Sequence, residues 1–195
     1  MILNIYGIDT TALITSLGVV GLVAGLALQD ILKDFLAGIA IITENQYQIG
    51  DIVTINGFKG EILSLGMKTT KLKDYNGDVK FIANGSITEV INHSISSSRA
   101  IINLSINYNE NINKVEKVLS DLFDKLNKEI KELKSDIQIL GVEDLGNSAV
   151  IIKIIADTEP MKHYDVERII RKKIKEEFDK FNIEIPYNQL VVHNG

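Results

Sequence analysis

The chain has 195 residues, of which 45 % are hydrophobic, and it carries a formal net charge of −5. This apolar content excludes a disordered chain, and the acidic balance argues against a protein built mainly to bind nucleic acid. Because the sequence has no cysteine and its three histidines are scattered singly, we expect no disulfide, no thiolate nucleophile, no metal site and no cofactor.

The N-terminal segment is the most apolar part of the chain. Asp9 is the only charged side chain before Gln29, whereas charges recur every few residues from Asp30 onward. As a helix, residues 11–29 would rise ~28 Å, close to the ~30 Å of bilayer hydrocarbon. A secretory signal is disfavoured because no Lys or Arg precedes the run. The segment therefore predicts a transmembrane helix over residues 12–29.

The side chains of this run are sorted around the predicted helix. Glycines lie on one face, where small residues allow close helix packing in a membrane; they are Gly18, Gly21 and Gly25. Leu22 and Leu26 form a stripe about a quarter-turn away from the glycines. The polar residues Thr15 and Gln29 lie at its two ends. Val19 and Val23 follow further round the helix. In a ring of helices the leucines would face the axis as a hydrophobic constriction. An anchor helix that dimerises through its glycines fits this periodicity equally well.

A second, amphipathic helix is predicted over residues 32–43. Its apolar residues share one face, which would lie along the membrane surface; they are Phe35, Leu36, Ile39 and Ile42. Asp30 begins the charged segment that separates the two predicted helices, and Gly38 is a candidate bend. Because Lys33 follows the apolar run and no basic residue precedes it, we expect the C-terminal side to be cytoplasmic.

Three segments, in this order, resemble the small-conductance mechanosensitive channel family. They are GLVAGLALQDILKDFLAGIAI (21–41), QIGDIVTINGFKGEILSLGMKTTKLKDYNGDVKFIANGSI (48–87) and IEIPYNQLVVH (183–193). The resemblance implies a homoheptameric ion channel of the cell (inner) membrane with a cytoplasmic vestibule, which opens under tension in hypo-osmotic shock. It also implies that Leu22 and Leu26 form the pore seal, with the three glycines as the packing face beside Val19 and Val23. Thr15, Gln29 and Lys33 are assigned to the pore mouth.

The sequence departs from the family in two ways. The family often has glycine where this chain has Asp30, so the expected hinge is placed at Asp30 or at Gly38. The family also has at least two further transmembrane helices before the pore helix, whereas about ten residues precede it here. We therefore expect a truncated or abbreviated chain that does not respond to tension by itself.

Residues 44–97 are predicted to form a small Sm-like or OB-like β-barrel. Short strands are expected over residues 51–55, 61–65, 69–73 and 79–83, separated by turn signals that include Asn-Gly pairs. Barrels of this kind can bind RNA through exposed aromatic side chains beside basic ones. Phe58, Tyr75 and Phe81 are few and separated, which favours structural packing over RNA binding.

Residues 98–181 are predicted to form a ferredoxin-like α+β domain with the order βαββαβ. Strands are expected over residues 100–107, 137–140 and 149–157, and helices over 112–133 and 163–180. The helices carry these apolar stripes: Val115, Val118, Leu119, Leu122, Leu126 and Leu133, then Val166, Ile169, Ile170, Ile174 and Phe178. Residues 182–195 contain Pro186 and predict an edge or intersubunit strand. The resemblance implies that one such strand from each subunit forms a seven-stranded barrel.

The chain is not expected to be an enzyme. It has no glycine-rich phosphate loop, no HExxH and no Ser-His-Asp order, and the adjacent Glu143 and Asp144 are most simply loop surface. The sequence thus predicts an α+β membrane protein that acts as a channel subunit, with copies of itself, membrane lipids and permeating ions as partners. The alternative is a membrane-anchored oligomerisation or binding module that conducts nothing.

Overall fold

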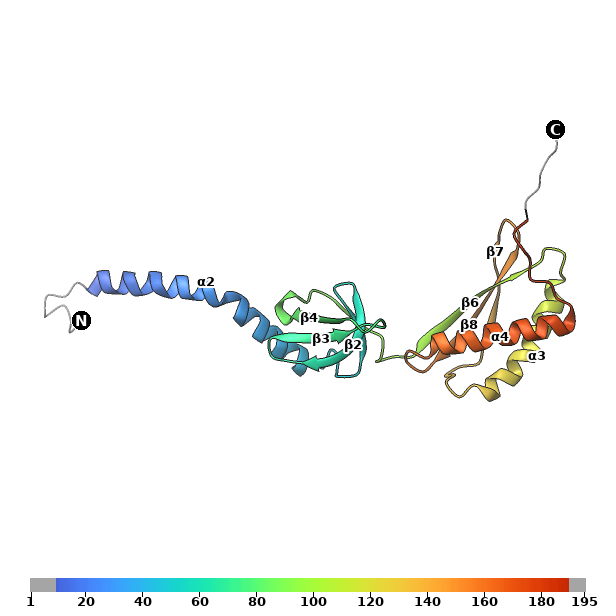
Figure 1. Cartoon of the computed structure of the whole chain (residues 1–195), viewed down its shortest axis with the longest axis horizontal. Helices are drawn as coiled ribbons and strands as arrows, with labels where there is room; N and C mark the ends of the chain where they lie inside the picture. Colours follow the sequence, from blue (N-terminus) through green and yellow to red (C-terminus); the bar gives the residue numbers. More distant parts are fainter. Residues whose placement is uncertain (1–9, 190–195) are drawn as a thin grey trace, which may run out of the picture. The chain divides into compact units, whose positions relative to one another are not determined.

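The computed structural model describes residues 10–189, apart from the side chains of residues 10, 12 and 13. The chain divides after Asn92 into two compact units. The first unit contains a long helix and a sheet, and the second contains a sheet and two helices (Figure 1). The architecture is α+β, as predicted.

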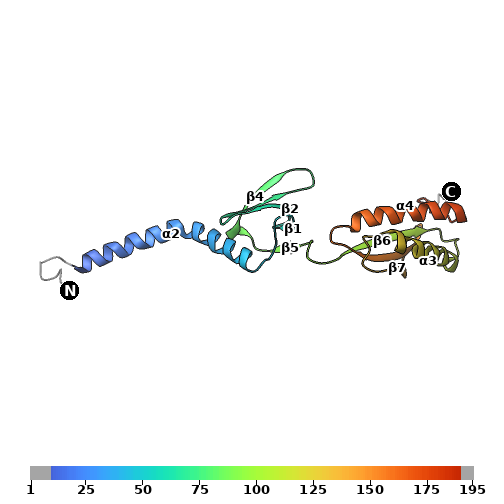
Figure 2. The same cartoon turned by 90° about the horizontal axis from the view of Figure 1, so that it is seen from below.

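The helix of the first unit is continuous where the sequence predicts two helices. α2 spans Thr10–Thr43 without interruption, and it changes direction along its length while remaining helical (Figures 1 and 2). An aspartate in a helix interior costs less than about 0.7 kcal/mol and a glycine about 1 kcal/mol relative to alanine. Asp30 and Gly38 are therefore tolerated inside α2, and the predicted break between two separate helices was wrong.

The sheet of the first unit is antiparallel, with the strand order β4-β3-β2-β1-β5. Its elements are β1 (Ile52–Ile55), β2 (Phe58–Leu65), β3 (Thr69–Lys73), β4 (Val79–Ala83), the short 3₁₀ helix η1 (Asn84–Ser86) and β5 (Val90–Asn92). Asn56 and Gly57 both have positive φ, 47° and 76°, between the paired residues Ile55 and Phe58. This is the tight hairpin predicted from the Asn-Gly pair. No pairing joins β4 to β5 within residues 10–189, so ladder hydrogen bonds do not close the sheet into a barrel.

The core of the first unit lies between this sheet and the segment that follows α2. It consists of side chains that are at most 5 % exposed: Ile41, Tyr47, Val53, Ile55, Ile62, Leu72 and Ile82. The end of α2 contributes Ile41 to this core, so the helix and the sheet form one folded unit.

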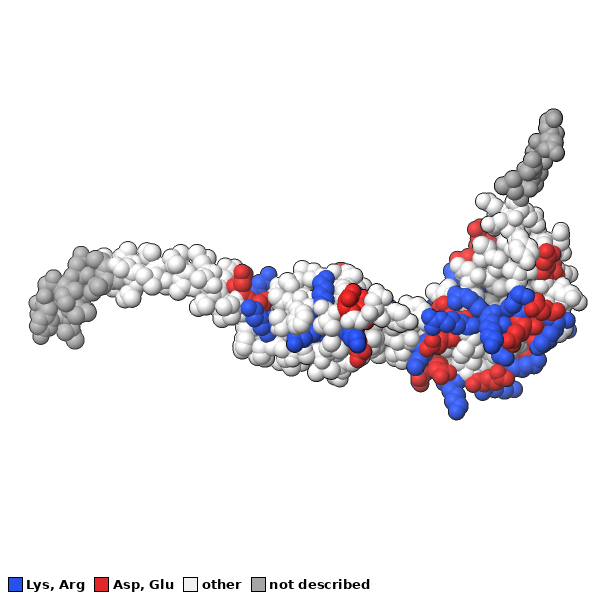
Figure 3. All heavy atoms as spheres, in the orientation of Figure 1, with Lys and Arg blue, Asp and Glu red and all other residues white. Residues whose placement is uncertain are grey.

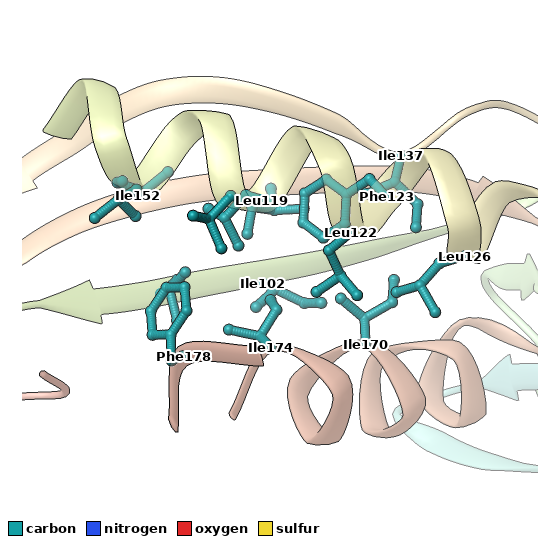
Figure 4. Packing of buried hydrophobic residues seen from close by; sticks show 14 of the residues in the cluster. Ile102, Leu119, Leu122, Phe123, Leu126, Ile137, Ile152, Ile170, Ile174 and Phe178 are labelled. Carbon is teal, nitrogen blue, oxygen red and sulfur yellow. The ribbon is translucent and has the colours of Figure 1, made fainter. Parts of the chain in front are cut away.

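The second unit has the order β6 (Ser98–Ile106), α3 (Ile112–Glu129), β7 (Gln138–Leu145), β8 (Val150–Thr158) and α4 (His163–Phe181). Its antiparallel sheet has the order β6-β8-β7. Side chains of α3 and α4 meet over the sheet, where Leu119, Leu122 and Leu126 approach Ile170 and Ile174 (Figure 4). Most of the predicted apolar stripes are buried here, although Ile169 is 40 % exposed and Leu133 follows the end of α3.

The C-terminal segment does not complete the predicted βαββαβ order within the described residues. Residues 183–189 form no strand, and the remainder of the predicted terminal strand lies outside the described residues. Asn107 donates through its backbone N–H to Glu184 O (3.3 Å), and Gln189 N–H donates to Ser148 Oγ (3.1 Å). The segment therefore crosses the end of the sheet and does not run along the edge of β6.

Candidate pore helix and its attachment to the sheet

Among residues 10–189, nothing packs against the N-terminal part of α2. Every residue from Ile14 to Lys33 is exposed, and no charged side chain lies on α2 before Asp30 (Figure 3). Of the helices in residues 10–189, α2 alone is long and apolar enough to cross a membrane, over Ile14–Thr43. Its apolar surface needs lipid or other chains to cover it.

The residues predicted to form the pore lie on this exposed part. Leu22 and Leu26 are 64 % and 63 % exposed, and an added Cβ at Gly18, Gly21 or Gly25 would have nothing within 4 Å. Val19, Val23, Gln29 and Lys33 are exposed as well, and the Thr15 hydroxyl donates to Thr11 O at 2.8 Å within the helix. A single chain brings none of these side chains together across a pore, so their roles as seal, packing face and pore mouth stay predictions.

The C-terminal part of α2 is attached to the sheet by a second face. Asp34, Gly38 and Ile41 follow one another at helical spacing and are all buried. The backbone N–H of Gly85 donates to Asp34 Oδ1 at 2.9 Å, across 51 residues of sequence. This bond fixes the helix to the turn that follows β4.

Gly38 allows the backbone of the sheet unit to approach α2. A Cβ at this position would lie 2.3 Å from Met67 O and 2.6 Å from Asn84 Nδ2. A side chain of any size would therefore push the helix away from the loop between β2 and β3. The sequence suggested Gly38 as a bend; the structure shows a residue required for close packing, and a hinge at Asp30 or Gly38 stays a prediction.

A buried chain of polar side chains lies beneath this attachment. The Thr70 hydroxyl donates to Asn84 Oδ1 at 2.9 Å and lies 3.2 Å from the Tyr47 hydroxyl. Since the single Thr70 proton is used on Asn84, the Tyr47 O–H donates to Thr70. Asn84 Nδ2 in turn donates to Gly66 O and Met67 O, at 2.9 Å and 3.1 Å. Burial raises the pKa of the Tyr47 phenol above its ordinary value of 10.0. These hydrogen-bonded side chains are therefore uncharged at physiological pH.

Sequence reasoning missed Asp34 and this polar chain. The charged residues after the apolar run predict a separation of two helices, and the hydrogen-bond partner of Asp34 is remote in sequence. The Asn84-Gly85 pair predicts only a turn.

The outward face of the same helical segment is apolar. Phe35, Leu36, Ile39 and Ile42 are between 38 % and 64 % exposed, on a face that begins beside the attachment and extends round to the opposite side. The predicted amphipathic stripe is therefore present as the second half of α2. Its neighbours outside the chain would be lipid or other apolar helices.

Two of the three aromatic side chains considered for RNA binding, Phe58 and Phe81, lie beside lysines, whereas Tyr75 is fully exposed. Lys71 Nζ lies 5.1 Å from the centre of the Phe81 ring, and Lys80 Nζ lies 5.0 Å from that of Phe58. One face of each ring is thus engaged within the sheet. Among residues 10–189, no group of three or more His, Cys, Asp or Glu side chains could hold a metal ion.

Two family models match the chain. The model described as "Mechanosensitive ion channel, beta-domain" matches residues 30–95, and the model described as "Mechanosensitive ion channel MscS, C-terminal" matches residues 100–185. These ranges include the attachment of α2, the first sheet and the second unit.

Relatives and solved structures agree with these matches. The chain is 34 % identical to a small-conductance mechanosensitive channel of Caldanaerobacter subterraneus subsp. tengcongensis, over 98 % of this chain and 68 % of that protein. It is 31 % identical to one of Helicobacter pylori, over 96 % and 69 %. The closed-state structure of Helicobacter pylori MscS matches with a TM-score of 0.81 at 27 % identity, over 99 % of this chain and 77 % of that one.

A more distant structure shares the fold. Arabidopsis thaliana MSL1 matches 94 % of this chain and 68 % of its own with a TM-score of 0.69 at 17 % identity. The two family models and the relatives from Caldanaerobacter subterraneus and Helicobacter pylori are all of mechanosensitive channels. The chain belongs to the MscS family of small-conductance mechanosensitive channels.

Proposed function

We propose that this chain is the pore-forming subunit of a mechanosensitive ion channel that releases ions and small solutes when membrane tension rises in hypo-osmotic shock. The observation that carries the proposal is the exposed, uncharged part of α2, on which glycines and leucines occupy different faces that the rest of the described chain does not cover. A homoheptamer would give each glycine face a neighbouring helix, and the leucines of all copies would then face one axis.

The proposed seal works by excluding water. Two stacked rings of leucine, from Leu22 and Leu26, would form a constriction that ions cannot cross without losing their hydration. Tension shifts the equilibrium toward the open state only if that state occupies more membrane area. Opening therefore requires α2 to tilt or rotate so that both leucines leave the axis.

The attachment at Asp34 and Gly38 couples this movement to the sheet unit. Because α2 is one continuous helix, a rotation of its pore-lining part is transmitted to the part attached at Gly85 and Met67. We propose that the sheet unit lies at the cytoplasmic membrane surface of the cell (inner) membrane, since Lys33 follows the apolar run. The exposed apolar stripe of this part of α2 would then face lipid.

In this proposal the cytoplasmic part of the oligomer encloses a vestibule. In this proposal the first sheet is an Sm-like barrel element, and the second unit is ferredoxin-like without its fourth strand. Residues 184–189 cross the end of the sheet, where they are hydrogen-bonded to Asn107 and Ser148. This path supports a terminal strand that pairs with the same strand of other subunits.

The test is electrical recording of the purified chain in planar bilayers, with Leu26→Ser and Leu28→Ser compared. Leu28 lies on the back of the helix, about 200° from Leu26, so it serves as a matched control. We expect Leu26→Ser to raise the closed-state leak by about tenfold or more, because each subunit would lose the hydrophobic contribution of a leucine. Leu28→Ser should leave the leak unchanged.

Two outcomes would contradict the proposal. Equal leaks in the two variants would remove Leu26 from the seal. A chain that inserts into the bilayer, assembles and never conducts would favour the alternative, a membrane-anchored oligomerisation or binding module, provided that a longer parent chain recorded alongside does not conduct either.

A further inference from the structure

Within residues 93–189, one edge of the second sheet pairs with no further strand and lies next to a helix. β6 is an outer strand in the order β6-β8-β7, and α4 runs alongside it (Figure 2). In an antiparallel ladder every second residue directs its N–H and C=O away from the paired strand. An outer strand with such groups is a template for another strand.

Ile101 is an outward-directed residue in the middle of β6. It lies opposite Ile155 of β8, yet its backbone N–H donates to Glu167 Oε1 of α4 at 3.1 Å. Its carbonyl oxygen accepts from Arg171 Nη2, also on α4, at 3.4 Å. At Ile101, the backbone N–H and C=O that a neighbouring strand would use are thus both bonded to side chains of α4.

The two α4 side chains are joined to one another. Arg171 Nη1 donates to Glu167 Oε2 at 2.9 Å, so Ile101, Glu167 and Arg171 form a closed ring of three hydrogen bonds. Glu167 is only 15 % exposed, while Arg171 is 50 % exposed. The pair provides one acceptor and one donor, which is what a peptide group of an added strand would provide.

We propose that Glu167 and Arg171 close the edge of β6 to strand addition by a second copy of this chain. β6 has nine residues with an apolar centre, and two copies could pair antiparallel about a twofold axis. Such pairing has to displace the ring at Ile101 and leave the carboxylate and the guanidinium without these partners. This inference does not depend on whether the chain conducts ions.

The experiment compares two double variants of the full chain in detergent. Glu167→Ala with Arg171→Ala removes the ring, and Asp165→Ala with Arg168→Ala removes an exposed ion pair (2.8 Å) from the same helix. Both variants lose one acid and one base, so their net charge is the same. The measurements are amide hydrogen exchange at Ile101 and Ile152, and assembly size by native mass spectrometry over a range of concentrations.

We expect the first variant to exchange at Ile101 at least about tenfold faster than the control variant, because this amide loses its acceptor. Ile152, in the central strand, should stay protected and show that the unit is folded. Species larger than the wild-type assembly should appear as concentration rises. Adding Asn103→Lys, which places a charge on the exposed edge, should remove these species.

Several results would overturn the inference. These are unchanged exchange at Ile101, a wild-type assembly size at every concentration, larger species that also form in the control, or larger species that persist with Asn103→Lys. If the double variant loses protection at Ile152, the single variant Arg171→Ala replaces it, because Glu167 then still holds the Ile101 amide. That variant should form the same larger species in smaller amount, and a wild-type assembly size would again overturn the inference.

Discussion

The glycines of α2 fall into two groups with opposite surroundings. Gly18, Gly21 and Gly25 lie on the exposed part of the helix, where an added Cβ would have nothing within 4 Å. Gly38 lies on the attached part, where the same Cβ would be 2.3 Å from a backbone oxygen. One helix therefore carries glycine for two reasons. At Gly38 the chain's own fold requires it, whereas at the other three positions nothing in residues 10–189 does, and packing against further copies stays a prediction.

Gly38→Ala is expected to have the largest effect on the chain itself. Overpacking against Met67 O costs about 1–3 kcal/mol, and better helix propensity returns about 1 kcal/mol. The measurement is hydrogen exchange at Ile62, whose amide donates to Asp51 O in the first sheet. We expect this amide to lose up to about 2 kcal/mol of protection, while the protection of the Ile152 amide in the second unit stays unchanged.

Gly21→Ala is the matched control for this change. It gives the same side chain to the same helix at a position with open space, so protection at Ile62 should not fall. An equal loss in both variants would contradict the division of the glycines into two groups.

Asp34→Ala should have the next largest effect, because it leaves the Gly85 N–H without its acceptor. An unsatisfied, partly buried donor costs about 1 kcal/mol or slightly more, and the loss should again appear at Ile62. Asp34→Asn keeps an oxygen acceptor and should stay within about 0.5 kcal/mol of wild type. If Asn behaves like Ala, the negative charge of Asp34 is what matters, and the hydrogen-bond explanation is wrong.

The smallest effect concerns Tyr47 and depends on pH. Since burial raises the pKa of its phenol above 10.0, the folded state retains this proton where the unfolded state has lost it. The contribution of the neutral phenol is therefore complete below about pH 10 and falls as pH rises through the higher, folded-state pKa. Tyr47→Phe loses the hydrogen bond to Thr70, about 1 kcal/mol, but has no phenol to titrate.

Thermal unfolding followed by circular dichroism between about pH 9 and about pH 11 tests this. The stability gap between wild type and Tyr47→Phe should narrow as pH rises. A constant gap would show that the phenol ionises equally easily in the folded and unfolded states.

Local patterns in the sequence predicted the features that depend on near neighbours. The Asn56-Gly57 hairpin followed from the backbone preference of two residues, and the stripe of α4 that includes Val166, Ile170 and Ile174 is buried as its spacing predicts. The exposed part of α2 was predicted from its composition alone.

Features that depend on distant residues were not predicted. Asp34 and Gly85 are 51 residues apart, and neither has a local pattern that identifies the other. The continuity of α2 was missed because an aspartate and a glycine in a helix interior each cost little. The predicted terminal strand extends beyond the described residues and would pair with other chains, so it stays a prediction.

The hydrogen bonds around Asn84 also bear on chemical ageing. Asparagine followed by glycine deamidates when the glycine nitrogen attacks the side-chain amide, and the first unit has such pairs at 56–57, 76–77 and 84–85. At Asn84 both reactants are held, since Gly85 N–H is bound to Asp34 and the amide is bound to Thr70, Gly66 and Met67. Asn76 is exposed in the hairpin between β3 and β4. The attachment that positions α2 thus also protects the asparagine whose conversion to aspartate would place a charge inside it.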